Sequence, residues 1–210
     1  MMAKLLSERD LYRIAATPEH LPALILTDKL PTSASGTVFA SVTELITQSD
    51  VNHSMLLLPE GLATQEKTYH VVGLERYLDG HHRIEVYRLR LDRFELGAIL
   101  ADARRDLADH WWRKLYDWLG IMGQALHISW LQNPLKYYCS ERCAKHLRRA
   151  ATIAALGLPT QPDPGDLKRW ALDHPYTVEC AGIYDPRLEE SSADGADPPS
   201  SLTGLRRTRG

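Results

Sequence analysis

The chain has 210 residues, a formal net charge of −2 and 44% hydrophobic residues, which suits one domain of moderate size, alone or with a tail. The nearly balanced charge does not indicate a nucleic-acid partner or an anionic membrane surface. No apolar run approaches the ~20 residues of a membrane span, and charged residues stand where a secretory signal has its apolar segment. We therefore expect a cytoplasmic protein, while packaging in a virion, which needs no signal, stays open.

The chain begins with a polar stretch that gives way to apolar segments. Residues 1–20 predict a short polar helix or a loosely attached N-terminal arm. The compact apolar run at 21–27 predicts a buried strand. After a loop rich in Pro, Ser, Thr and Gly, apolar residues recur at helical spacing and predict a helix over about 36–47.

Three strands are predicted in the middle of the chain, at 53–58, 68–74 and 83–90. The segments between them, 59–67 and 76–82, are predicted to be loops that shape substrate specificity. Because these connections are short, we expect neighbouring strands to run antiparallel.

Helical periodicity returns in the second half. A helix is predicted over 94–109, with an apolar stripe on one face. The aromatic-rich segment 111–128 is expected to pack as core or as a pocket wall. A second helix is predicted over 139–156, followed by a last strand at 177–184.

These elements predict an α+β fold, a small antiparallel sheet packed against helices. The residues from about 189 onwards are rich in Ser, Asp, Pro and Gly, a composition typical of disorder. The expected organisation is an N-terminal arm (1–20), one folded domain (21–188) and a disordered tail (189–210).

The most informative residue is Cys139, at the predicted start of a helix. The positive end of the helix dipole lowers the pKa of a thiol placed there and favours the thiolate nucleophile. His53, at the start of a strand, is the candidate base. The backbone N–H of Cys139 is the candidate oxyanion donor, since N–H groups of a first helical turn lack intrahelical partners. His70 is our choice to orient His53, with Gln65 and Glu75 as alternatives.

The chain has three cysteines, an odd number that fits a reducing compartment better than a disulfide framework. Cys143 falls on the apolar stripe of the predicted helix and is expected to be core. Cys139, Cys143 and His146 together can suggest a metal site, but one crowded helix face is a poor tetrahedral cage. We therefore expect no metal.

Four stretches, in this order, resemble one known family. They are Ile25-Leu26-Thr27 followed by a helix and Asn52-His53, then Glu85-Val86-Tyr87-Arg88-Leu89, then Tyr116-Asp117-Trp118-Leu119-Gly120-Ile121-Met122-Gly123, and finally Tyr137-Tyr138-Cys139-Ser140-Glu141. The set resembles the circularly permuted papain-like cysteine hydrolases of the YiiX-like branch, related to NlpC-type amidases and lecithin–retinol acyltransferase. In this branch the histidine strand precedes the cysteine helix, the reverse of ordinary papain-like enzymes.

The resemblance implies a permuted papain-like fold and a thiol peptidase or amidase that works through a thioester, with Cys139 as nucleophile and His53 as base. It implies no cofactor, and substrates that are peptides, peptidoglycan-like peptides or acyl amides. Two alternatives stay open, a non-catalytic papain-like binding or structural module, for example in a phage or prophage, and a lipid acyltransferase. The sequence does not indicate an oligomeric state.

Overall fold

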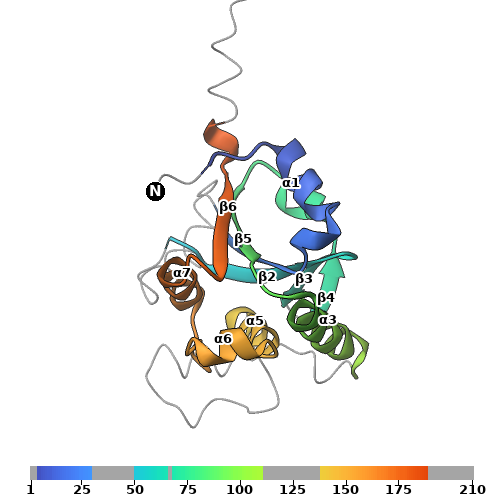
Figure 1. Ribbon diagram of the computed structural model, residues 1–210. Helices are drawn as coiled ribbons and strands as arrows, with labels where there is room; N and C mark the ends of the chain where they lie inside the picture. Colours follow the sequence, from blue (N-terminus) through green and yellow to red (C-terminus); the bar gives the residue numbers. More distant parts are fainter. Residues whose placement is uncertain (1–3, 30–49, 66–67, 111–137, 189–210) are drawn as a thin grey trace, which may run out of the picture.

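The computed structural model describes residues 4–29, 50–65, 68–110 and 138–188 (Figure 1). Its centre is a six-stranded sheet in the order β4-β3-β2-β1-β5-β6, in which every neighbouring pair is antiparallel. The strands are β1 (Ala23–Lys29), β2 (His53–Leu58), β3 (Gly61–Gln65), β4 (Tyr69–Val72), β5 (His82–Leu89) and β6 (Val178–Tyr184). The predicted α+β class with an antiparallel sheet is confirmed.

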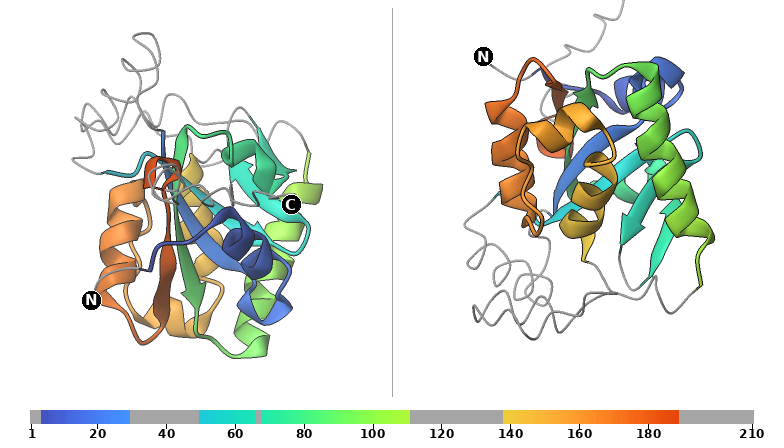
Figure 2. Two further views of the ribbon diagram at one scale, coloured as in Figure 1. Left: turned by 90° about the horizontal axis from the view of Figure 1, so that it is seen from above. Right: turned by 60° about the horizontal axis from the view of Figure 1, so that its bottom comes forward.

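Helices cover both faces of this sheet. The helical elements are α1 (Glu8–Ala15), η1 (Pro18–His20), η2 (Leu74–Tyr77), α3 (Arg93–Ala108), α5 (Cys139–Leu147), α6 (Ala151–Ala155) and α7 (Pro164–Asp173). Figures 1 and 2 show α3, α5, α6 and α7 together on one face, with α1 on the other. The sheet is therefore the middle layer of three.

The strands supply apolar side chains to both faces because successive residues of a strand point in opposite directions. In β1, Leu24 and Leu26 belong to the core under α5 and α7, whereas Ala23 and Ile25 belong to the core under α1. This double burial explains why the central strands read as nearly continuous apolar runs in the sequence.

The N-terminal residues are packed against the domain. Ser7 caps α1 in a reciprocal capping box with Asp10, and Leu11 and Ile14 bury their side chains in the core on that face of the sheet. The polar helix predicted within residues 1–20 is thus present, and the described part of this segment forms the outer layer over one sheet face.

Backbone pairing attaches the same segment to the edge strand β6. The amide of Leu6 donates to the carbonyl of Ile183 and the amide of Ile183 donates to the carbonyl of Lys4, both at 2.8 Å. Gly182 permits this approach: its φ is +151°, and a Cβ there would lie 2.4 Å from the Lys4 carbonyl oxygen. A side chain at this position would push the N-terminal segment off the sheet edge.

Two expectations need correction, and one helix was missed. The helix predicted over 139–156 is two helices, α5 and α6, because Ala150 is extended (φ −77°, ψ 124°). The loop predicted over 59–67 contains β3, which forms a hairpin with β2. Helix α7 was not predicted, although Asp163 and Asp166 form a capping box around Pro164 at its start.

Several predictions fall outside the described residues. They are the helix at 36–47, the aromatic segment at 111–128 and the tail at 189–210. Among the described strands, β2 begins and ends where predicted, and β1, β4, β5 and β6 lie within two residues of prediction at each end.

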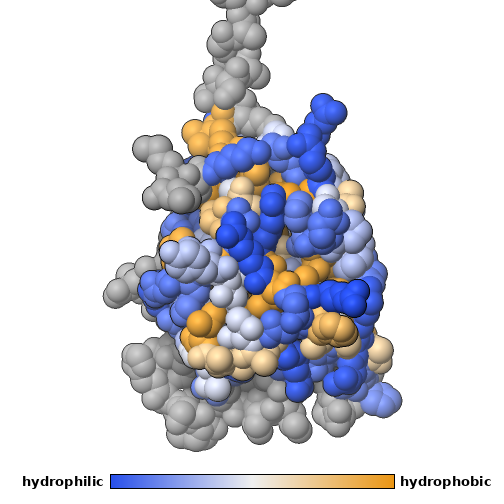
Figure 3. Space-filling model, in the orientation of Figure 1, coloured by the Kyte–Doolittle hydropathy of each residue, from blue (hydrophilic) through white to orange (hydrophobic). Residues whose placement is uncertain are grey.

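The face shown in Figure 3 is mainly hydrophilic, with small areas of apolar residues among polar ones. Among the described residues, the large apolar side chains that are exposed come from separate parts of the chain: Leu5, Tyr12, Phe94, Leu172, Tyr176 and Leu188. In the part of the chain that the structure describes, no helix has the length and apolar character needed to cross a bilayer.

Candidate active site

Cys139 is the first residue of α5, as predicted. The preceding residue, Tyr138, is extended (φ −93°, ψ 174°), so the helix begins sharply at the cysteine. Helix α5 packs on β2 and β3, and the hydroxyl of Ser140 donates to the carbonyl of Pro162 at 2.6 Å. The thiol therefore sits at the positive end of a helix whose first turn is fixed to the rest of the domain.

His53 is the first residue of β2, also as predicted. The residue before it ties the strand start to β1, because the Asn52 amide donates to the Thr27 carbonyl and the Asn52 side chain donates to Asp28, both at 3.0 Å. These contacts fix the backbone from which the imidazole projects.

The structure brings Cys139 and His53 together. Burial of the sulfur would raise the pKa of Cys139, but the positive charge of protonated His53 and a side-chain hydrogen bond with His53 oppose it, as do contacts with the backbone N–H and hydroxyl of Ser54. The net effect lowers the pKa of Cys139 to about 7, from an ordinary cysteine value of about 8.5. Near neutral pH a large share of this thiol is therefore the nucleophilic thiolate, stabilised by an imidazolium.

The second nitrogen of His53 is held by Thr64, which lies on β3. His53 Nε2 is 2.8 Å from Thr64 Oγ1. A ring nitrogen held by a neighbouring side chain fixes the orientation of the imidazole. Thr64 therefore occupies the orienting position beside His53, and Nδ1 is the nitrogen left for the thiol.

The predicted orienting residue, His70, is elsewhere. It lies on β4 opposite Thr64, and its Nδ1 is 2.8 Å from the Thr68 carbonyl. The prediction treated β4 as the neighbour of β2, but β3 lies between them. Of the two alternatives, Gln65 is buried at the end of β3 and Glu75 is exposed on η2. Recognition of the hairpin after Leu58 would have identified Thr64.

The other two cysteines differ chemically from Cys139. Cys143 lies one helical turn further along α5, where burial, reinforced by the charge on Cys139, raises the pKa of its thiol. Burial also raises the pKa of Cys180. Both are protonated thiols at neutral pH, and Cys143 belongs to the core as expected.

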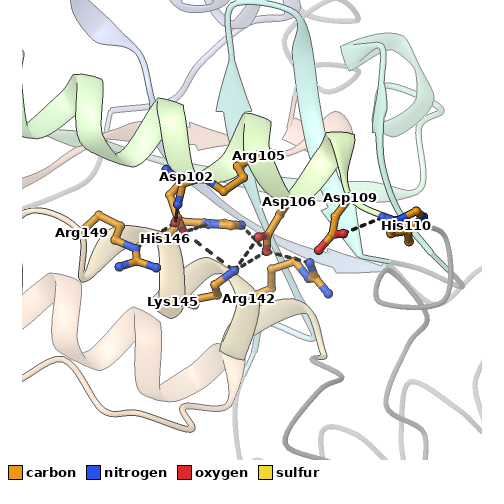
Figure 4. Close-up of polar contacts among 9 residues, drawn as sticks. All are labelled: Asp102, Arg105, Asp106, Asp109, His110, Arg142, Lys145, His146 and Arg149. Atoms are coloured by element: carbon orange, nitrogen blue, oxygen red, sulfur yellow. Dashed lines mark hydrogen bonds and ion pairs between the residues drawn. The ribbon is translucent and has the colours of Figure 1, made fainter.

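A cluster of charged residues holds α5 against α3 (Figure 4). Asp106 of α3 accepts from Arg142 at 2.9 Å and from Lys145 at 2.6 Å. The Arg142 side chain is only 3% exposed, and its guanidinium also lies over the Tyr69 ring of β4, 4.7 Å from the centroid. These contacts fix the helix that carries Cys139 at points one and nearly two turns beyond the thiol.

His146 completes this cluster as a fully buried neutral imidazole. Burial lowers the pKa of His146, while its Nδ1 is 2.8 Å from Asp102 Oδ2. Burial alone would raise the pKa of Asp102, but the hydrogen bond from His146 and the nearby cations hold it far below its usual range. An ionised aspartate can only accept, so Nδ1 of His146 carries the hydrogen.

Among the described residues, no group of three or more His, Cys, Asp or Glu side chains is arranged to hold a metal ion. No protein-family model, curated protein or solved structure matched the chain. The chemistry of the site is therefore argued from its own residues.

Proposed function

We propose that this chain is a cysteine-dependent hydrolase of amide bonds, or less favourably of esters, that works through a thioester. The observation that carries the proposal is the contact between His53 and the thiol of Cys139, which begins α5. This contact, together with those of Ser54, lowers the pKa of Cys139 to about 7. Perturbed thiols of this kind, paired with an imidazole at a helix N-terminus, are typical of nucleophilic cysteines.

In the first half of the reaction, His53 takes the proton of Cys139 and the sulfur attacks the carbonyl carbon of the substrate. The carbonyl oxygen becomes an oxyanion, and the backbone N–H of Cys139 is our candidate to stabilise it. The bond from the carbonyl carbon to the leaving nitrogen or oxygen then breaks. His53 gives its proton to that leaving group, and a thioester remains on Cys139.

In the second half, His53 takes a proton from water and the resulting nucleophile attacks the thioester. The bond from carbon to sulfur breaks, the acid product leaves, and the proton returns to the Cys139 thiolate. Thr64 holds Nε2 of His53 through both halves, so the same ring nitrogen faces the reacting atoms each time.

The arrangement of elements supports a permuted papain-like enzyme, since the histidine strand precedes the cysteine helix in the chain and α5 packs on β2. On this proposal the substrates are peptides, peptidoglycan-like peptides or acyl amides, and no cofactor takes part. A papain-like module without activity and an acyltransferase are outcomes that the following experiment separates.

The test uses p-nitrophenyl acetate as a small activated acyl donor. We expect a burst of nitrophenol and an acetyl group on Cys139, detected by mass spectrometry of the digested protein. C139S should lower turnover by at least about 100-fold. C143S is the matched control, because it changes the other thiol of the same helix, and it should keep most of the activity.

Two further outcomes decide between the alternatives. Transfer of the acetyl group to an added amine in preference to water identifies an acyltransferase. Absence of acetylation at Cys139 in the folded protein, or equal losses in C139S and C143S, contradicts nucleophilic catalysis by Cys139. A panel of peptide amides and N-acyl lipids then defines the substrate class.

A further inference from the structure

We propose that Tyr77 is a positioning residue of this site, acting on His53 through Thr64; the inference rests on the proposed hydrolase function. Tyr77 is the last residue of η2 and is buried. Its hydroxyl is 3.3 Å from Thr64 Oγ1, which is itself 2.8 Å from His53 Nε2. Three side chains from β2, β3 and η2 thus form one hydrogen-bonded chain.

The Tyr77 ring also contacts His53 directly. The two rings are nearly parallel, with an interplanar angle of 16° and centroids 6.4 Å apart. This separation is within the range of interacting aromatic rings. Tyr77 therefore restricts the imidazole plane as well as the hydroxyl that holds the imidazole.

The direction of the hydrogen bonds follows from the chemistry. To take a proton on Nδ1, neutral His53 must carry its hydrogen on Nε2 and donate it to Thr64. The Thr64 hydroxyl then keeps its own hydrogen, and the oxygen of Tyr77 is placed to accept it. A hydroxyl that donates a hydrogen bond is a better acceptor. By accepting from Thr64, Tyr77 therefore strengthens the hydrogen bond that Thr64 accepts from His53 Nε2–H. This bond is strongest when His53 is the imidazolium paired with the Cys139 thiolate.

Neighbouring side chains hold Tyr77 in place. The His82 ring meets it edge-on, with centroids 5.1 Å apart and an angle of 69°. Nδ1 of His82 is in turn 2.8 Å from Asp79 Oδ1. The segment between β4 and β5, predicted from the sequence as a specificity loop, thus supplies support for the candidate base.

The experiment measures how the rate of Cys139 alkylation by iodoacetamide depends on pH, followed by mass spectrometry of the cysteine peptide. We expect Y77F to raise the midpoint by about half a pH unit, which slows alkylation at pH 7 about twofold, and T64V to raise it by about one unit. The T64V/Y77F double variant should match T64V alone, because Tyr77 acts through the threonine hydroxyl. T64S, which keeps that hydroxyl, should keep the wild-type midpoint.

Y184F is the matched control. Tyr184 lies in the same core cluster as Tyr77, and its hydroxyl donates to Glu8 of α1 at 3.2 Å, so Y184F removes a tyrosine hydroxyl from that cluster where it bonds to α1. An unchanged midpoint in Y77F, or additive shifts in the double variant, overturns the positioning role of Tyr77. If H53A also leaves the midpoint unchanged, the Cys139–His53 pair itself fails, which distinguishes the failure of the proposed function from that of this inference.

Discussion

Replacing Asp106 with alanine is expected to lower the free energy of unfolding by about 3 kcal/mol, because it removes the carboxylate that pairs with the buried guanidinium of Arg142. The carboxylate of Asp106 pairs with Arg142, whose side chain is 3% exposed, and with Lys145. The Arg142 guanidinium stays over the Tyr69 ring when the carboxylate is removed. Urea denaturation followed by circular dichroism measures the change.

Glu60→Ala is the matched control for this substitution. Glu60 also pairs with an arginine of α3, Arg104, but the two side chains are 47% and 51% exposed. An exposed pair contributes less than about 1 kcal/mol, so the control should unfold at nearly the wild-type urea concentration. Equal losses in the two variants would show that the charges joining α3 to α5 do not anchor the cysteine helix.

His53→Ala is expected to slow alkylation of Cys139 by iodoacetamide at pH 7 about tenfold. Without the imidazolium, burial again dominates and the thiol ionises only at higher pH; the greater nucleophilicity of a more basic thiolate offsets part of the loss. The deficit should shrink as the pH is raised towards the new pKa, which separates lost ionisation from lost access.

His81→Ala controls for the removal of an imidazole near the sheet. His81 is exposed, and its backbone amide donates to Asp79. The variant should alkylate at the wild-type rate across the pH range. A deficit in H53A that persists unchanged at high pH would mean that His53 governs access to the thiol and not its ionisation.

The two principal residues of the site could be predicted because each stands at an element boundary with a local signal. A continuous apolar run, Met55 to Leu58, begins two residues after His53. Cys139 stands in the sequence Tyr-Cys-Ser-Glu, where helical spacing of apolar residues begins. Both residues are the first of their elements in the structure. The contact between Cys139 and His53 was predicted only from the resemblance in the order of the segments. A local sequence pattern cannot show that two residues so far apart in the chain meet.

Predicting the residue that orients His53 required the pairing of the strands, which the sequence did not supply. The five residues of strand β3, Gly-Leu-Ala-Thr-Gln at 61–65, do not alternate between apolar and polar, so they give no strand signal. With β3 treated as a loop, His70 became the nearest polar strand residue to His53. The sequence Pro59-Glu60-Gly61 directly after β2 was the signal for a hairpin that places Thr64 there instead. Gly61 opens β3 with a φ of +129°, and a Cβ there would lie 2.6 Å from the Val72 carbonyl oxygen.

Other features depend on contacts between distant parts of the chain. The N-terminal segment can pack against β6 because Gly182 has no side chain. No local sequence pattern predicts that Leu6 and Gly182 lie together. The predicted long helix is interrupted at Ala150. The side chain of Ala150 is buried in the same core as Leu147 and Ile153. Helix propensity alone favours continuation there, and tertiary packing overrides it.

The most direct test of the central claim, that Cys139 and His53 form a nucleophile–base pair, is the pH dependence of Cys139 alkylation in the wild-type protein. Below its pKa the thiol is protonated and unreactive, and above it the thiolate reacts, so the rate should rise through a midpoint near pH 7. Cys143 and Cys180, whose pKa values are raised by burial, should react only at higher pH than Cys139 in the same digest. A Cys139 midpoint at or above the ordinary cysteine value of about 8.5 would contradict the pair.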